Sequence, residues 1–148
     1  MNTSLRSELD EALSAVIAEM QGAIAALGES LADERKALDQ ADSTALNHAG
    51  DRKRSLLAQL EQLDVERQQL LREAGATNAA QQSTWDRVLE ALHDCQRTNQ
   101  RNGNIIAQRL KHVRQALSVL TGKQDETGIY GPAGQLSHGC RSLPLARI

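Results

Sequence analysis

The residues of this chain that could carry out chemistry are few and widely separated. His93 and Cys95 are two positions apart in a helical stretch, which turns them about 200° from each other, so they cannot share one metal ion. His138 and Cys140 form a similar pair near the C-terminus, without the second pair that a zinc site requires. The sequence also contains no phosphate-binding loop, nucleophile motif or paired carboxylates. It therefore argues against an enzyme, a metal site or a bound cofactor.

The segment GIYGPAGQL (residues 128–136) contains the only tyrosine of the chain. Trp85 is the only other aromatic residue, and phenylalanine is absent. Glycine and proline beside Tyr130 argue against a helix or an inner strand there, so we do not expect Tyr130 in a core. A lone aromatic side chain on such a segment is suited to insert into the pocket of a partner.

Composition predicts one soluble, cytoplasmic domain. The chain has 148 residues with 1% aromatics, so a core must consist of Leu, Ala, Ile and Val. A formal net charge of −2 gives no overall attraction to nucleic acid or to an anionic membrane. The N-terminal residues do not resemble a signal peptide, and no apolar run approaches the ~20 residues that span a bilayer. We interpret Cys95 and Cys140 as free thiols in a reducing compartment.

Three long segments carry apolar residues at steps of three and four, which is the pattern of one helix face. The first stripe is Leu5, Leu9, Leu13, Val16, Met20, Ile24, Leu27, Leu31 and Leu38. The second is Leu46, Ala49, Lys53, Leu56, Leu60, Leu63, Arg67, Leu70 and Ala74. The third is Trp85, Val88, Leu92, Cys95, Asn99, Asn102, Ile106, Leu110, Val113, Leu117 and Leu120. We expect the stems of Lys53 and Arg67 to lie along the second stripe with their charges in water.

These stripes predict helices at about residues 4–40, 43–74 and 83–121. Asp42 or Ser43 can cap the second helix and Thr77, Asn78 or Ser83 the third, while Gly75 and Gly122 are natural C-terminal stops. Short connections place consecutive helices side by side and antiparallel. The predicted fold class is all-α: an elongated antiparallel three-helix bundle with coiled-coil-like packing over residues 1–122. A flexible tail is expected at residues 123–148.

The third stripe contains polar residues where a core would have leucine. A buried Asn without a partner costs on the order of 1 to 3 kcal/mol, so Asn99 and Asn102 must bond to another helix, reach water or face a partner. Gly103 follows them in mid-helix, which lowers stability unless something approaches the backbone closely. Two alternatives remain open. Either these residues fix the register of the helices, as a core Asn does in coiled coils, or another helix docks here.

Charge is distributed unevenly between the predicted helices. The first helix is rich in Asp and Glu, whereas the chain between Cys95 and Gln124 has no acidic residue and several Arg and Lys. The two faces could simply neutralise each other within the bundle. Alternatively, the basic helix could receive an amphipathic helix of a partner in a groove. Nucleic acid fits poorly, because aromatic rings for base stacking are missing near this segment.

Taken together, several stretches resemble a known family. ADERKALDQAD leads into DRKRSLLAQLEQLDVERQQLL, a Trp opens the third helix, and NQRNGNIIAQRLKHVRQALSVLTG precedes IYGPAGQL. This ordered series is similar to the flagellar FlgN-type export chaperones. The Asn-x-x-Asn-Gly run followed by two isoleucines, and the Tyr-Gly-x-x-Gly element, are the most specific parts. Residues 137–148 have no counterpart.

The resemblance implies a cytoplasmic export chaperone that binds hook-associated (hook–filament junction) flagellar proteins. It would mask their C-terminal helical segments and deliver them to the flagellar type III export gate, without a cofactor, nucleic acid or direct membrane insertion. Tyr130 would contact the cytoplasmic domain of the gate. The C-terminal amphipathic helix would bind the cargo, which assigns this role to Asn99, Asn102, Gly103, Ile105, Ile106, Arg109, Leu110, Val113, Leu117 and Leu120.

A second hypothesis assigns the chain to a different class. The same stripes could belong to a structural coiled-coil protein that associates with itself and has no role in export. Co-purification distinguishes the two, because a chaperone recovers flagellar subunits at near one-to-one stoichiometry, whereas a scaffold recovers mainly itself.

Overall fold

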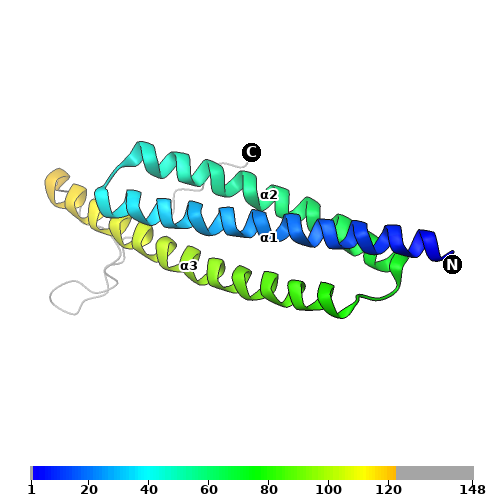
Figure 1. Cartoon of the computed structure of the whole chain (residues 1–148). Coiled ribbons are helices and arrows are strands. Elements are labelled where there is room, and N and C mark those ends of the chain that lie inside the picture. Colours follow the sequence, from blue (N-terminus) through cyan, green and yellow to red (C-terminus); the bar gives the residue numbers. More distant parts are fainter. Residues whose placement is uncertain (1, 123–148) are drawn as a thin grey trace, which may run out of the picture. The chain divides into compact units, whose positions relative to one another are not determined.

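The computed structural model describes residues 2–122, and three α-helices account for nearly all of them (Figure 1). They are α1 (Thr3–Gln40), α2 (Ser43–Ala74) and α3 (Ala79–Thr121). Consecutive helices are antiparallel, so α1 and α3 run in the same direction (Figure 1). The predicted all-α class and antiparallel three-helix bundle are thus confirmed. The predicted tail at residues 123–148, including Tyr130, lies outside the described residues.

The chain divides into two units. Residues 1–107 form the first, which holds the bundle, and residues 108–148 form the second, of which the structure describes the end of α3. Each unit is described by itself below. The predicted division at residue 122 stays a prediction.

The connection between α1 and α2 consists of two residues with specific conformations. Ala41 lies in the left-handed region with φ 53°, and the N–H of Asp42 donates to the carbonyl of Ala37 at 3.0 Å. The carboxylate of Asp42 accepts the N–H of Ala45 at 3.0 Å, so Asp42 is the N-cap, as one of the two predicted candidates. These bonds satisfy backbone groups at both helix ends and reverse the chain direction.

The helix α3 begins at Ala79, earlier than the predicted start near residue 83. Asn78 accepts the N–H of Gln81 at 2.8 Å, and the Gln81 side chain accepts the N–H of Asn78 at 3.0 Å. This reciprocal pair is a capping box, which fixes the helix start at Asn78 rather than at Ser83.

The helix α2 ends at Gly75, which has φ 81° and whose N–H donates to the carbonyl of Leu71 at 2.9 Å. Gly75 is therefore the C-terminal stop that the sequence predicts.

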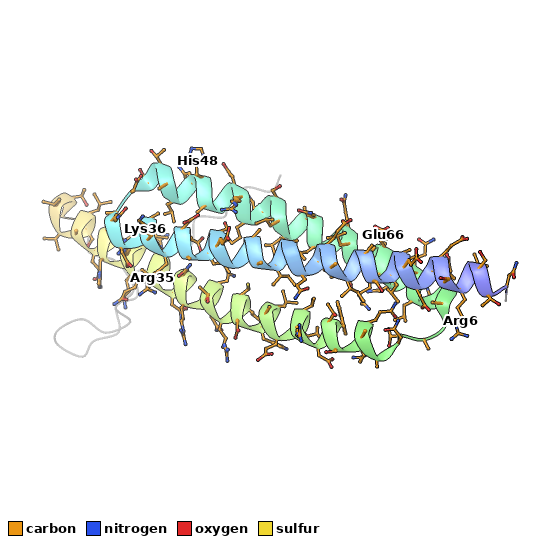
Figure 2. The ribbon with its side chains drawn as sticks, in the orientation of Figure 1. Arg6, Arg35, Lys36, His48 and Glu66 are labelled. Carbon is orange, nitrogen blue, oxygen red and sulfur yellow. The ribbon has the colours of Figure 1, made fainter. Side chains whose placement is uncertain are left out.

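The central helix α1 is buried on two sides, because it contacts both α2 and α3. Most of the predicted first stripe is buried, with Leu5 as an exposed exception. A second set of buried positions was not predicted from periodicity. These positions are buried because α1 contacts two helices rather than one: Ile17, Ala23, Ser30, Glu34 and Ala37. Charged side chains such as Arg35, Lys36 and Glu66 lie on the outside of the bundle (Figure 2). Among residues 2–122, no helix has the length and apolar character needed to cross a membrane.

The helix α2 buries the predicted second stripe. Leu60, Leu63 and Ala74 are buried on this face. The expectation for Lys53 and Arg67 was wrong in one respect, because their charges are paired rather than left in water. Lys53 bonds a buried carboxylate, described below, and the Arg67 guanidinium lies 3.9 Å from the centre of the Trp85 ring while bonding Asp64 at 2.8 Å.

The helix α3 packs against α1 through a face that matches the predicted stripe only in part, at Val88, Cys95 and Asn102. Its buried residues recur every seven positions, at Gln81, Val88, Cys95 and Asn102. With the half-buried residues between them they form the bundle seam: Gln81, Thr84, Val88, Ala91, Cys95, Thr98, Asn102 and Ile105. Leu92, expected in the core, is 41% exposed, and Asn99 is exposed. The third stripe was therefore partly wrong.

Polar contacts show why this face was selected. Side chains of the bundle seam donate to α1 backbone carbonyls: Gln81 to Asp10 at 2.9 Å, Cys95 to Ile24 at 3.8 Å and Asn102 to Leu31 at 3.0 Å. Each pair is separated by 71 residues, so one register holds the two parallel helices. The small residues of the seam allow side chains to reach the α1 backbone, which periodicity of large apolar residues does not reveal.

Candidate functional site

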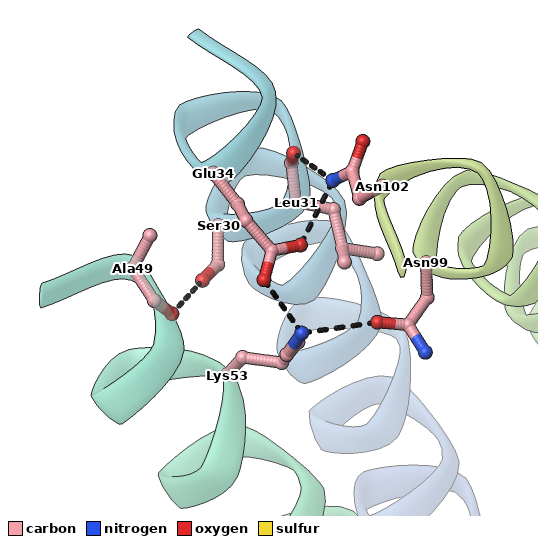
Figure 3. Close-up of polar contacts among 7 residues, drawn as sticks. All are labelled: Ser30, Leu31, Glu34, Ala49, Lys53, Asn99 and Asn102. Atoms are coloured by element: carbon pink, nitrogen blue, oxygen red, sulfur yellow. Dashed lines mark hydrogen bonds and ion pairs between the residues drawn. The ribbon is translucent and has the colours of Figure 1, made fainter. Parts of the chain in front are cut away.

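Asn102 is the centre of a buried polar contact between α1 and α3 (Figure 3). Its side chain is 1% exposed, and its Nδ2 donates to the carbonyl of Leu31 at 3.0 Å and to the Glu34 carboxylate at 2.8 Å. Its Oδ1 has no hydrogen-bond partner among the described residues. Asn102 thus bonds across to another helix, which is one of the arrangements that the sequence left open.

Lys53 extends this contact to α2 (Figure 3). Its ammonium group donates to Glu34 at 2.7 Å and to the Oδ1 of Asn99 at 3.0 Å. Nearby, the Ser30 hydroxyl donates to the carbonyl of Ala49 at 3.0 Å. We call this set the polar layer: Ser30, Glu34, Lys53, Asn99 and Asn102. It joins all three helices at one level, so it favours the register role that a polar residue can have in a coiled coil.

Sequence reasoning missed the two α1 members of the polar layer. Glu34 occupies a stripe position, since it lies three residues after Leu31 and four before Leu38. A carboxylate on an apolar stripe, with a basic residue on the stripe of the next helix, was the available signal. Lys53 is that basic residue. It can occupy a seam position because its ammonium group pairs with Glu34.

Interhelical charge pairing occurs mainly between α1 and α2. Arg52 bonds Glu29 at 3.3 Å and Asp33 at 3.5 Å, and both pairs are exposed. Glu29 and Asp33 of α1 thus pair with α2. Within residues 2–122, Arg101, Lys111 and Arg114 have no carboxylate at ion-pair distance. Arg101, which lies in the same unit as these acids, is therefore not neutralised by them.

The predicted cargo residues of the first unit differ in their accessibility. Asn102 is buried, Ile105 and Ile106 are half-buried, and Asn99 is exposed. Gly103 is also exposed, and a Cβ placed there would meet nothing within 4 Å. No part of the described chain therefore needs a glycine at this position for close packing.

The predicted cargo residues of the second unit are on the surface. Leu110, Val113 and Leu117 are 50%, 55% and 54% exposed, and Leu120 is 82% exposed. Steps of three and four residues place these four side chains on one face of α3, and we call them the C-terminal stripe. Arg109 and Arg114 are exposed on the same helical segment. The segment is thus an amphipathic, basic helix whose apolar face is accessible.

In the part of the chain that the structure describes, groups suited to catalysis are not brought together. Among the described residues, no three His, Cys, Asp or Glu side chains lie close enough to hold a metal ion. Burial first, and the charge of Asp94 second, raise the pKa of the Cys95 thiol above its usual range, which makes it a poor nucleophile. A groove of about 540 Å³ between α1 and α2 contains His48 and Arg52 but no nucleophile beside them.

An accessible apolar helix face, with no catalytic group among residues 2–122, is typical of a protein-binding module. The family model described as FlgN protein matches residues 1–138, and the chain belongs to this family. Searches of curated proteins and of solved structures each found no match. The resemblance found in the sequence is therefore confirmed.

Membership in this family establishes the biological role. FlgN proteins are cytoplasmic, non-enzymatic flagellar export chaperones for hook-associated proteins, and this chain is one of them. The hypothesis of a structural coiled-coil protein without an export role is set aside accordingly. Hook-associated proteins are its partners, as the sequence predicts.

Proposed function

We propose that the C-terminal stripe of α3 is the surface that binds hook-associated cargo, and that Tyr130 carries the loaded chaperone to the export gate. One observation supports the first part most strongly: four large apolar side chains on one helix face are half exposed or more. A contiguous apolar face of this kind on a soluble protein usually marks a binding site.

The physical basis for cargo binding is burial of this stripe. Complete burial of one leucine or valine side chain contributes about 1.5 to 3 kcal/mol relative to exposure. An amphipathic helix of the cargo can cover Leu110, Val113 and Leu117 together, since all three lie on one side of α3. The cargo's own apolar face would then be shielded from water, which is what a chaperone must achieve before export.

The remaining predicted cargo residues have different parts in this proposal. In the first unit, Ile105 belongs to the bundle seam and would hold α3 against α1, whereas Asn99, Gly103 and Ile106 would take part in cargo binding. Arg109 of the second unit is exposed and would take part as well. Asn102 would act indirectly, because its side chain is enclosed in the polar layer and already bonds α1. It would hold α3 in place rather than touch the cargo.

An aspartate substitution tests the cargo site. Leu117→Asp places a charge on the stripe, and the charge would lose its water in the complex, so cargo affinity should fall at least ten-fold. Val65→Asp is the matched control, because Val65 is an exposed residue of α2. Both variants should melt within a few degrees of wild type. Equal cargo binding by Leu117→Asp and wild type, measured with a purified hook-associated protein, would remove the stripe from the site.

The gate contact is tested at Tyr130. Tyr130→Ala should leave the melting temperature and cargo affinity unchanged while weakening binding to the gate's cytoplasmic domain by ~2 kcal/mol or more, as for a buried aromatic anchor. The measurement compares wild type and variant, each with and without cargo. If the loaded variant binds the gate as tightly as loaded wild type, Tyr130 has no part in docking.

A further inference from the structure

The C-terminal stripe is out of phase with the bundle seam. Continued by heptads from Asn102 and Ile105, the seam would present Arg109, His112, Ala116 and Val119. The apolar residues instead come one position later, at Leu110, Val113, Leu117 and Leu120. One residue corresponds to a rotation of about 100° on a helix. The stripe is therefore a second seam, which lies on its own face of the helix.

Charged residues lie at the heptad positions beside this second seam. If Leu110 and Leu117 take the a positions and Val113 and Leu120 the d positions, Arg109 is at g and Arg114 at e. In a coiled coil these are the positions that border the apolar seam on either side and select the partner by charge. Both arginines are exposed. The second seam is thus bordered by positive charge on both sides.

Asp and Glu are absent from the sequence around these arginines. Residues 96–122 contain no Asp or Glu. Arg114 and the neighbouring Lys111 have no carboxylate at ion-pair distance within the described residues.

We infer that the second seam selects its partner by charge, and that the partner is an amphipathic helix with Asp or Glu bordering its apolar heptad face. This inference rests on the proposed cargo site and specifies the chemistry of its ligand. A helix bordered by Lys or Arg would bring like charges together at both arginines, which disfavours it. Charge therefore adds selectivity to a surface whose affinity comes from apolar burial.

Two synthetic peptides provide the direct probe. Both are three heptads long with leucine at a and d, and they differ only in Glu or Lys at the e and g positions. At low ionic strength the Glu peptide should bind the full chain about ten-fold more tightly than the Lys peptide. The difference should shrink in about 1 M salt, where charges are screened beyond about 3 Å. Equal binding of the two peptides would overturn the inference.

Charge reversal in the protein supplies the complementary test. Arg109→Glu with Arg114→Glu should invert the peptide preference and weaken binding of a purified hook-associated protein several-fold. Arg54→Glu with Arg87→Glu is the control, because it changes the net charge equally at exposed positions outside the second seam. Unchanged cargo binding in the reversed variant, together with loss in Leu117→Asp, would reject the charge selection and leave the cargo site intact. No loss in Leu117→Asp would reject both.

Discussion

The ammonium group of Lys53 on α2 lies 2.7 Å from the carboxylate of Glu34 on α1, whose side chain is only 5% exposed. Asn102 of α3 donates to the same carboxylate. Glu34 is thus the acceptor on which all three helices converge. A nearly buried carboxylate persists only because these donors replace its lost water.

We expect Glu34→Ala to lower the free energy of unfolding by about 3 kcal/mol, because it leaves Lys53 and Asn102 without their acceptor. Chemical denaturation measures this change. The neighbouring Asp33→Ala is the control, since Asp33 is paired with Arg52 at the surface and should cost less than about 1 kcal/mol. Similar small losses for both variants would mean that the polar layer adds little to stability.

Leu60→Ala should lower the free energy of unfolding by about 2 to 5 kcal/mol, because Leu60 is a buried member of the core. Val65→Ala, at an exposed position of the same helix, should change it by less than about 0.5 kcal/mol. Urea denaturation of the two variants gives both values. A loss below about 1 kcal/mol at Leu60 would show that the α2 seam is not a core face.

Two glycine substitutions should have opposite effects. Gly103→Ala should raise the free energy of unfolding by up to about 1 kcal/mol, because the position is helical and a Cβ meets nothing there. Gly75→Ala should lower it by about 1 kcal/mol, because Gly75 has φ 81°. Thermal denaturation compares them. A destabilising Gly103→Ala would reveal close packing against this glycine.

Cys95 should react slowly with alkylating reagents. Burial and the Asp94 charge raise its pKa, so the thiol stays protonated to higher pH than a free cysteine. A raised folded-state pKa stabilises the fold below the unfolded pKa, and this contribution disappears as pH rises through the folded value. The rate of reaction with iodoacetamide, measured against pH in a Cys140→Ser variant, checks the slow reaction and the raised pKa of Cys95. A rate profile identical to that of the unfolded chain would contradict them.

The sequence predicted the number, order and pairing of the helices, and it predicted α2 best. That helix buries one face, so Leu60 and Leu63 follow directly from steps of three and four residues. The helix α1 has two neighbours, and one period cannot describe two buried faces, which is why Ile17 and Glu34 were missed. In α3 the predicted stripe included the buried Val88 and Asn102, but it also included the exposed Leu92, because the position that packs there is the small residue Ala91.

The candidate site was harder to predict for a related reason. The spacing of Leu110 and Leu117 places them on one helix face. The same spacing is also typical of a buried seam, so it does not show whether that face is exposed. Whether a face is covered depends on its neighbours, which one helix sequence does not contain. The shift in phase after Ile105 was nevertheless present in the sequence, and it became interpretable once the register between α1 and α3 was known.

Amide hydrogen exchange of the chaperone with and without a purified hook-associated protein tests the central claim most directly. Exchange reports where backbone hydrogen bonds become protected when cargo binds. If the C-terminal stripe holds the cargo, residues 108–121 should exchange at least ten-fold more slowly in the complex, while α2 should change little. Unchanged exchange in residues 108–121, with protection confined to α1 or α2, would contradict the account.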